Sequence, residues 1–162
     1  MHYKNGDLLD ADVDFICHQV NCKGVMGAGI ARQIRDRHPE VYEYYHKYCE
    51  SNKNCELSSR ILGDVLIYPT DQYTVVNIFG QDDYGRNGLY TDYDAFRDAL
   101  HGFKKYLLDP ANEVSPNAKI GFPFGIGCGL AGGEWKKVQD MIMAFDKQVP
   151  QQVIIYKFRR NG

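Results

Sequence analysis

Short apolar runs rich in β-branched and aromatic residues recur along the chain and predict the strands of one sheet. In chain order they cover residues 1–3, 13–20, 61–68, 73–79, 120–124 and 153–158. The first run is short and stops at Asn5-Gly6, a turn signal, so we expect it at an edge of the sheet. Pro69-Thr70-Asp71-Gln72, between the third and fourth runs, is typical of a hairpin, which makes that pair of strands antiparallel.

Between these runs, the apolar residues follow a helical spacing. Ile30 and Ile34 lie about one turn apart, and Pro39 is a residue type favoured at the first position of a helix. Thr91 and Asp94 resemble a capping box at the start of a later helix. The predicted helices cover residues 29–37, 39–49, 93–107 and 134–145. The mixture of strands and helices predicts an α/β fold.

Composition narrows the class of protein. The 162 residues, 44% of them apolar, suffice for a single domain spanning residues 1–162. Lysine and arginine number 19 against 21 acidic residues, so no strong field attracts nucleic acid or an anionic membrane, and we expect no sequence-specific nucleic-acid binding. The N-terminal residues lack an apolar signal core and no apolar run is long enough to span a membrane, from which we expect a cytoplasmic protein.

The cysteines suggest neither disulfides nor a metal site. Their number is odd, no two have the Cys-x-x-Cys spacing, and no histidine pair has the spacing of zinc ligands. They are Cys17, Cys22, Cys49, Cys55 and Cys128. We therefore expect reduced thiols, no metal and no cofactor.

Two glycine-rich segments each follow a predicted strand and precede a predicted helix, at residues 21–31 and 125–133. We call them the first and second glycine loops. Glycine lets successive backbone N–H groups turn toward a ligand, and a helix N-terminus adds unpaired donors, so each loop is suited to bind phosphate. Together they predict the two walls of one diphosphate cleft.

The residues present argue against two well-known phosphate loops. Neither glycine loop contains the Gly-Lys-Ser/Thr ending through which nucleoside triphosphatases hold phosphate and magnesium. A Rossmann turn needs a small residue where this chain has Arg32, after Gly27 and Gly29. Both nucleoside triphosphate hydrolysis and dinucleotide redox chemistry are therefore disfavoured.

Other candidate residues keep two interpretations open. His18, near the end of a central strand, is either hydrogen-bonded in the core or directed into a site. Four tyrosines, Tyr42, Tyr44, Tyr45 and Tyr48, either form an amphipathic helix wall or stack on nucleic-acid bases. The segment at residues 80–90, which we call the polar loop, has the composition and length of a functional loop.

Three separated motifs, in the same order, resemble those of the macrodomains, whose ligand is ADP-ribose. They are Gly6-Asp7-Leu8-Leu9, the segment His18-Gln-Val-Asn21-Cys-Lys-Gly24-Val-Met-Gly27-Ala-Gly29-Ile-Ala, and Pro123-Phe-Gly-Ile-Gly-Cys-Gly-Leu130 followed by Trp135. The most similar branch contains terminal ADP-ribose protein glycohydrolase, the DNA ADP-ribosylglycohydrolase antitoxins and the yeast-type ADP-ribose-1''-phosphate phosphatase. The resemblance implies a three-layer α/β/α fold with a mixed, mostly parallel central sheet.

The resemblance also implies a set of ligand contacts. Asp7 would accept a hydrogen bond from the adenine amino group with Leu8 beside it, and Asn21 would face the distal ribose. Around the diphosphate and distal ribose it places residues of the two glycine loops, namely Gly24, Val25, Met26, Gly27, Gly29, Ile30, Gly125, Ile126, Gly127, Cys128, Gly129 and Leu130. The partner would be ADP-ribose or an ADP-ribosylated small molecule, protein or nucleic acid.

Catalysis is the point on which this chain departs from the branch. The glycohydrolases use a lysine after the strand that here covers residues 75–79, and one adds an aspartate in the second glycine loop, whereas this chain has Gly80-Gln81 and Ala131. His18 matches a histidine of the phosphatase and is the leading catalytic candidate, as a general base or acid. We expect a hydrolase of an ADP-ribose adduct at the distal ribose, with a non-catalytic ADP-ribose reader as the alternative.

Overall fold

The computed structural model describes residues 1–53 and 58–158. Cys55 and part of the polar segment at residues 51–59 lie outside the described residues. Within these ranges, no helix combines the length and apolar character needed to cross a membrane.

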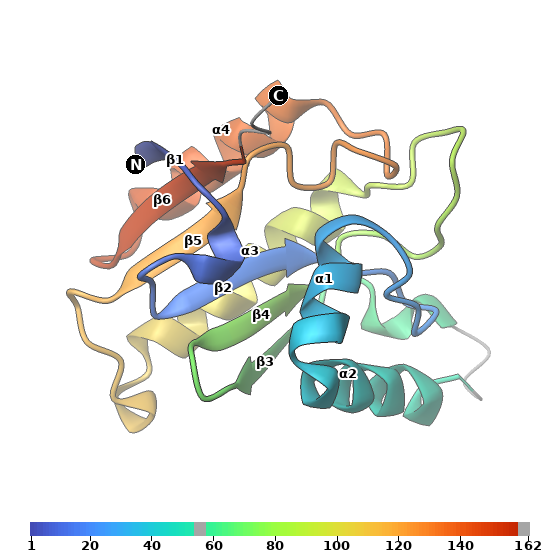
Figure 1. Cartoon of the computed structure of the whole chain (residues 1–162), viewed down its shortest axis with the longest axis horizontal. Helices are drawn as coiled ribbons and strands as arrows, with labels where there is room; N and C mark the ends of the chain where they lie inside the picture. Colours follow the sequence, from blue (N-terminus) through green and yellow to red (C-terminus); the bar gives the residue numbers. More distant parts are fainter. Residues whose placement is uncertain (54–57, 159–162) are drawn as a thin grey trace.

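A single mixed sheet forms the middle layer of the fold (Figure 1). Its strand order is β1-β6-β5-β2-β4-β3, and all neighbours are parallel except the β3/β4 hairpin. The strands are β1 (His2–Asn5), β2 (Phe15–Gln19), β3 (Val65–Pro69), β4 (Thr74–Ile78), β5 (Lys119–Pro123) and β6 (Gln152–Lys157). The predicted hairpin and the predicted edge position of the first strand are both confirmed.

The buried strands carry apolar side chains on both faces of the sheet, so helices pack against each face. On one face, α1 (Gly29–Arg37) and α2 (Pro39–Ser51) pack in a core with Ile16 and Val75. On the other, α3 (Tyr93–Leu108) and α4 (Trp135–Asp146) pack in a second core with Cys17 and Val76. Short 3-10 turns η1 (Leu8–Asp10), η2 (Ser58–Ile61) and η3 (Pro110–Asn112) complete the elements. The predicted three-layer α/β/α fold is confirmed.

The start of α3 corrects the predicted capping box. Asp92, not Thr91, is the N-cap residue, and its carboxylate accepts a hydrogen bond from the Ala95 N–H at 3.0 Å. The Thr91 hydroxyl instead donates to the main-chain oxygen of Gly127 at 2.6 Å. The local sequence pattern predicts that Thr91 caps the helix, but its hydroxyl instead bonds to the second glycine loop.

The tyrosines of α2 pack along the side of the helix that faces the rest of the protein. Tyr45 is fully buried, and the Tyr48 hydroxyl donates to the carboxylate of Asp64 at 2.5 Å. The Tyr42 ring packs under the guanidinium of Arg35, 4.0 Å from its centre. These contacts favour the amphipathic wall over a platform for bases.

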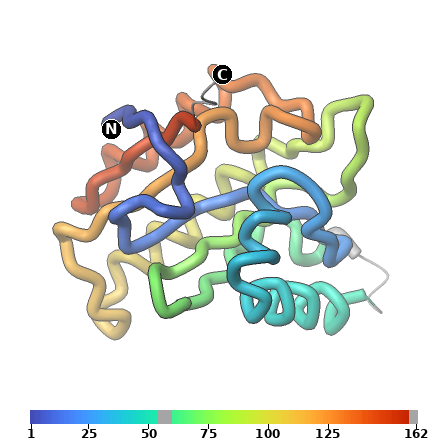
Figure 2. The backbone as a smooth tube through the Cα atoms, viewed as in Figure 1, coloured from blue at the N-terminus to red at the C-terminus, as the bar shows by residue number. Residues whose placement is uncertain are grey.

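The parallel strands bring the segments of interest to one edge of the sheet. The first glycine loop follows β2, the polar loop follows β4, and the second glycine loop follows β5. Because the carboxyl ends of parallel strands lie at the same edge, the three loops run along one side of the molecule (Figure 2).

Candidate ligand-binding cleft

A cavity of about 630 Å³ opens where the three loops meet. This volume falls within the range typical of small-molecule sites, about 300–1,000 Å³. The first glycine loop and adjoining residues contribute Gln19, Val20, Asn21, Val25, Gly27, Ala28, Gly29, Ile30 and Ala31. The polar loop contributes Gln81, Tyr84, Gly85 and Arg86, and the second glycine loop with the end of β5 contributes Pro123, Phe124, Gly125, Ile126, Gly127, Gly129, Leu130 and Ala131.

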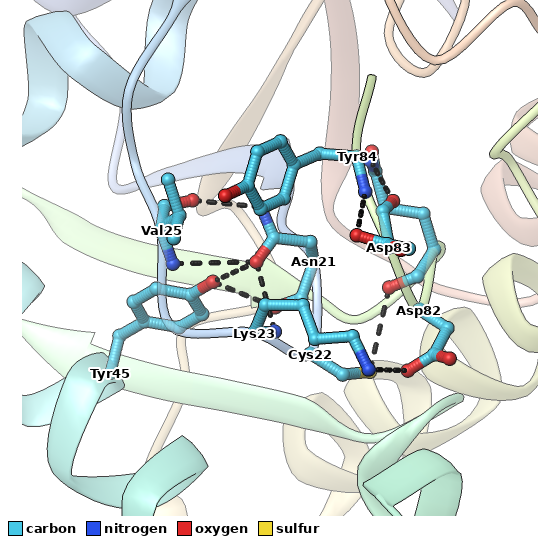
Figure 3. Close-up of polar contacts among 9 residues, drawn as sticks. Asn21, Cys22, Lys23, Val25, Tyr45, Asp82, Asp83 and Tyr84 are labelled. Carbon is cyan, nitrogen blue, oxygen red and sulfur yellow. Dashed lines mark hydrogen bonds and ion pairs between the residues drawn. The ribbon is translucent and has the colours of Figure 1, made fainter.

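Asn21 gives the first glycine loop its shape (Figure 3). Its Oδ1 accepts hydrogen bonds from the backbone N–H groups of Lys23 at 3.0 Å and Val25 at 3.4 Å, and its Nδ2 donates to the Val25 carbonyl at 2.8 Å. Behind it, the buried Tyr45 hydroxyl lies 2.7 Å from the Asn21 carbonyl oxygen and 2.9 Å from Oδ1. An amide NH₂ has two donors, so one N–H of Asn21 is left for a ligand in the cleft.

Helix α1 begins at the cleft without a side-chain cap. Ala28 is its N-cap residue and makes no side-chain hydrogen bond, and Gly29 takes a left-handed φ of 58°. The first N–H groups of a helix have no partner inside it and carry a partial positive charge. Because Ala28, Gly29 and Ile30 line the cleft, these N–H groups can bind an anion such as a phosphate.

The second glycine loop forms the opposite wall. Gly125 and Gly127 adopt left-handed φ values of 78° and 74°, which favour glycine. At Gly125 and Gly129, an added Cβ would have no neighbouring atom within 4 Å, so both positions border open space. At these glycine positions the wall therefore presents backbone to the cleft.

A buried hydrogen-bond network connects the loops beneath the cleft. The Gln19 amide nitrogen donates to Gln81 Oε1 at 2.8 Å and to the Thr91 hydroxyl at 2.9 Å, and that hydroxyl donates to the Gly127 carbonyl. Gln81 and Thr91 also pair as an isolated antiparallel bridge that closes the base of the polar loop. Strand β2 thus fixes the polar loop and the second glycine loop relative to each other.

The polar loop is also attached to the first glycine loop (Figure 3). The Cys22 N–H donates to the Asp82 carbonyl at 2.9 Å, and the Lys23 ammonium lies 3.5 Å from the Asp82 carboxylate. Asp82 therefore faces Lys23 and does not line the cleft.

The structure brings most of the predicted ligand-binding residues together in the cleft. Asn21, Val25, Gly27, Gly29, Ile30, Gly125, Ile126, Gly127, Gly129 and Leu130 all line it. Gly24, Met26 and Cys128 lie in the same loops but behind the lining. Gly24 packs against His46, Met26 is buried, and the Cys128 thiol donates to the Ile126 carbonyl at 3.3 Å.

Asp7 and Leu8 lie outside the cleft lining, at the carboxyl end of β1. The Asp7 carboxylate caps the 3-10 turn η1 by accepting the Leu9 N–H at 3.0 Å, and Leu8 is buried. One carboxylate oxygen accepts this bond and the other has no such partner among the described residues. Since β1, β6 and β5 are neighbours, Asp7 lies at the same edge of the sheet as Phe124.

His18 is in the core and not in the cleft. Its side chain is fully buried, and its Nε2 lies 2.5 Å from Asn77 Oδ1 on β4. Because Asn77 uses its amide nitrogen to donate to the Leu66 carbonyl, its oxygen faces His18, which makes Nε2 the donor. Burial lowers the pKa of His18 to about 4, against a weaker opposite effect of this hydrogen bond. The geometry favours the core interpretation of His18 over the catalytic one.

The other titratable groups near the cleft are poorly suited to act as nucleophiles. Burial raises the pKa of Cys128, and burial together with the nearby Asp82 raises the pKa of Cys22 to about 12. Among the described residues, no cluster of histidine, cysteine and acidic side chains has an arrangement able to hold a metal ion.

In place of a lysine after β4, the chain has Gly80 packed against Gln19. A Cβ at Gly80 would approach Gln19 Oε1 to 2.3 Å and Gln19 Cδ to 2.8 Å, so a side chain at position 80 requires the end of the Gln19 side chain to move. Gln19, Gln81, Arg86 and Phe124 are cleft residues that the sequence analysis did not select. Their signal was their position, directly after buried strands or within the polar loop.

Comparison with known proteins agrees with the fold. No family model matches the sequence. The macrodomain of Mycobacterium tuberculosis DarG superposes with a TM-score of 0.76 at 25% identity, covering 96% of this chain and 95% of that one. The layer order, the mixed sheet and the two glycine loops over one cleft therefore define a macrodomain fold.

In sequence, the chain resembles two kinds of named enzyme. It is 29% identical over 160 residues to a DNA ADP-ribosyl glycohydrolase of Mycobacterium tuberculosis. The matched region covers 95% of this chain but only 41% of that protein. It is 26% identical over 175 residues to an ADP-ribose 1''-phosphate phosphatase of Scheffersomyces stipitis, covering 95% of this chain and 99% of that protein. The chain thus spans about two fifths of the mycobacterial relative and nearly the whole of the yeast one.

Proposed function

We propose that the chain binds ADP-ribose in the cleft and hydrolyses an adduct at its distal ribose. The observation that carries this proposal is the cleft itself, with two backbone-lined glycine walls and the uncapped start of α1 between strands β2 and β5. The names of its relatives support the same ligand, since one acts on ADP-ribosylated DNA and the other on ADP-ribose 1''-phosphate.

The backbone N–H groups of the two walls are suited to bind the negatively charged diphosphate. Hydrogen bonds to a charged group contribute about 1.5–3 kcal/mol each, so several backbone N–H groups supply much of the roughly −8 kcal/mol that micromolar binding requires. No basic patch is needed, which fits a formal net charge of −2.

The residues at the two ends of the cleft support one orientation of the ligand. At the β5 end, Phe124 is 41% exposed, and its ring centre lies 4.8 Å from that of Trp135 and 4.8 Å from the Lys157 ammonium. The exposed part of this aromatic pair offers a surface on which adenine can pack. Asp7 stands at the same sheet edge with one carboxylate oxygen available for the adenine amino group. The distal ribose then lies at the β4 end, near Gln19, Asn21 and Gln81.

In this proposal, the cleft promotes hydrolysis by positioning a water molecule against the distal ribose. Among the described residues, the lining contains no carboxylate, imidazole or thiol. The amide nitrogens of Asn21 and Gln81 each donate one of their two N–H groups, to the Val25 and Asp83 carbonyls, so the other N–H is placed to hold a water molecule at the distal ribose. Backbone donors that stabilise the departing group would supply the remaining effect.

The same observation favours a second candidate function. A cleft whose described lining contains no carboxylate, imidazole or thiol is also suited to a reader that binds ADP-ribose or its conjugates without turnover. The fold and the ligand are common to both functions, so only a turnover measurement separates them.

The experiment is a substrate panel. The protein is incubated with ADP-ribose 1''-phosphate, O-acetyl-ADP-ribose, ADP-ribosylated protein and ADP-ribosylated DNA, and release of the free product is followed. A Gly129→Leu variant is the control, because position 129 borders open space in the cleft and its φ is not left-handed. Turnover of one adduct that Gly129→Leu abolishes supports a hydrolase. Binding without turnover of any of the adducts supports a reader.

A further inference from the structure

Arg86 is the one charged side chain in the lining of the cleft, as far as the chain is described. Arg37 and Arg97 pair with the carboxylates of Asp10 and Asp94. The Arg86 guanidinium, by contrast, has no acidic side chain within ion-pair distance among residues 1–53 and 58–158. An arginine in a cleft without an internal counter-charge is available for an anion of the ligand.

The loop that carries Arg86 is fixed to both walls of the cleft. At its start, Asp82 is held by the Cys22 N–H and the Lys23 ammonium of the first glycine loop. At its end, the N–H groups of Tyr90 and Thr91 donate to the Ala131 carbonyl at 2.7 and 3.1 Å.

The middle of the loop packs closely as well. An added Cβ at Gly132 would come within 2.3 Å of the Gly88 carbonyl oxygen, and one at Gly85 would meet the Tyr90 hydroxyl at 2.0 Å. The second glycine loop and the polar loop are therefore in direct backbone contact. Arg86 lies between these attachments, so it is presented to the cleft from a restrained segment.

The strand order places Arg86 at one end of the cleft. The polar loop follows β4, whereas Phe124 follows β5 and Asp7 follows β1, on the other side of β2. In the orientation proposed above, adenine lies toward β5 and the distal ribose toward β4. The polar loop, and Arg86 with it, thus approaches the ligand from the side of the distal ribose, away from the adenine.

We propose that Arg86 selects ligands that carry a second anionic group, a phosphate monoester on the distal ribose. This inference rests on the proposed function and on its ligand orientation. A guanidinium binds a phosphate through two parallel charge-assisted hydrogen bonds, which a neutral acyl group cannot accept in the same way. The backbone donors of the glycine walls bind the diphosphate, and Arg86 supplies the positive charge for the terminal phosphate.

The test compares two ligands on four proteins by isothermal titration calorimetry. ADP-ribose and ADP-ribose 1''-phosphate are titrated into the wild type, Arg86→Gln, Arg86→Lys and Arg97→Gln. The last is the matched control, because Arg97 lies on α3 outside the cleft lining and its loss changes the net charge equally. If phosphate is released during titration, the initial-rate KM for each protein replaces the dissociation constant.

We expect the wild type and Arg97→Gln to bind the phosphorylated ligand about tenfold more tightly than ADP-ribose, which corresponds to about 1.4 kcal/mol. Arg86→Gln should lose this preference while its affinity for ADP-ribose changes less than about twofold, and Arg86→Lys should keep part of it. Equal weakening of both ligands would assign Arg86 to the diphosphate and overturn the inference, as would an unchanged preference. Failure of the wild type to bind ADP-ribose would instead contradict the proposed function.

Discussion

Tyr45 is the buried residue that supports the first glycine loop from behind. It is fully buried on α2, and its hydroxyl contacts both the main-chain oxygen and Oδ1 of Asn21. Asn21 in turn accepts the N–H groups that curve the loop toward the cleft. The shape of the loop that we propose binds the ligand thus depends on a side chain in the core.

Replacing Tyr45 with phenylalanine should destabilise the protein and weaken ligand binding. The change leaves the buried Asn21 acceptors short of a donor, at a cost of about 1–3 kcal/mol in the free energy of unfolding. Urea unfolding and ADP-ribose titration measure the two effects. Tyr44→Phe is the control, since Tyr44 lies on the same helix, is 47% exposed and should tolerate the change. Equal stability of the two variants would contradict this role for Tyr45.

His18 should make stability depend on pH. Its pKa in the folded state, about 4, lies below the ordinary value of 6.5, so protonation favours the unfolded chain. The stability associated with neutral His18 is fully present above the ordinary pKa and is lost as the pH falls toward the folded one.

We expect a loss of about 2–3 kcal/mol on going from about pH 7.5 to about pH 4.5, measured by urea unfolding. His18→Gln should remove most of this dependence. Burial also lowers the pKa of His38, which is present in both proteins, so the difference between them isolates His18. An identical pH profile for the variant would refute the assignment. A buried neutral histidine also predicts that His18→Gln retains any turnover the cleft supports.

At the level of elements, the regular structure was largely predictable and the tertiary use of polar side chains was not. Strands β2, β4 and β5 and helices α1 and α2 follow from apolar periodicity and from Pro39, because these patterns reflect local geometry. The spacing of Thr91 and Asp94 predicts a capping box at the start of α3. The Thr91 hydroxyl bonds to Gly127, a residue far away in the chain, and no local pattern records such a contact.

Thr91 and the neighbouring Asp92 should therefore have separable effects. Thr91→Val removes the hydrogen bond to the second glycine loop and should weaken ADP-ribose binding several-fold. Asp92→Ala removes the N-cap of α3 and should lower the free energy of unfolding by about 0.5–2 kcal/mol with ligand affinity unchanged. Calorimetry and urea unfolding of both variants test this, and loss of affinity in Asp92→Ala alone would reverse the assignment.

At the level of the whole molecule, the sheet order explains why the backbone walls of the cleft can be predicted from the sequence, whereas the side chains that the polar loop contributes to it cannot. Two glycine loops after parallel strands must meet at one sheet edge, so the backbone walls follow from the sequence. The polar loop has no periodicity, and which of its side chains reach the cleft depends on its attachments to Cys22, Lys23 and Ala131. The sequence therefore does not single out Arg86. Nor does it distinguish a catalytic His18 from a buried one, because the burial of His18 and its bond to Asn77 depend on tertiary packing.

The central claim, that this cleft binds ADP-ribose, is tested most directly by calorimetric titration of ADP-ribose into the wild type and Gly129→Leu. We predict binding of one ligand per chain by the wild type with a dissociation constant in the micromolar range, roughly −8 kcal/mol. Gly129→Leu should unfold at the same temperature as the wild type and show no binding, because the added side chain occupies the cleft. Absence of binding by the wild type at tens of micromolar protein, or undiminished binding by a folded Gly129→Leu, would contradict the account.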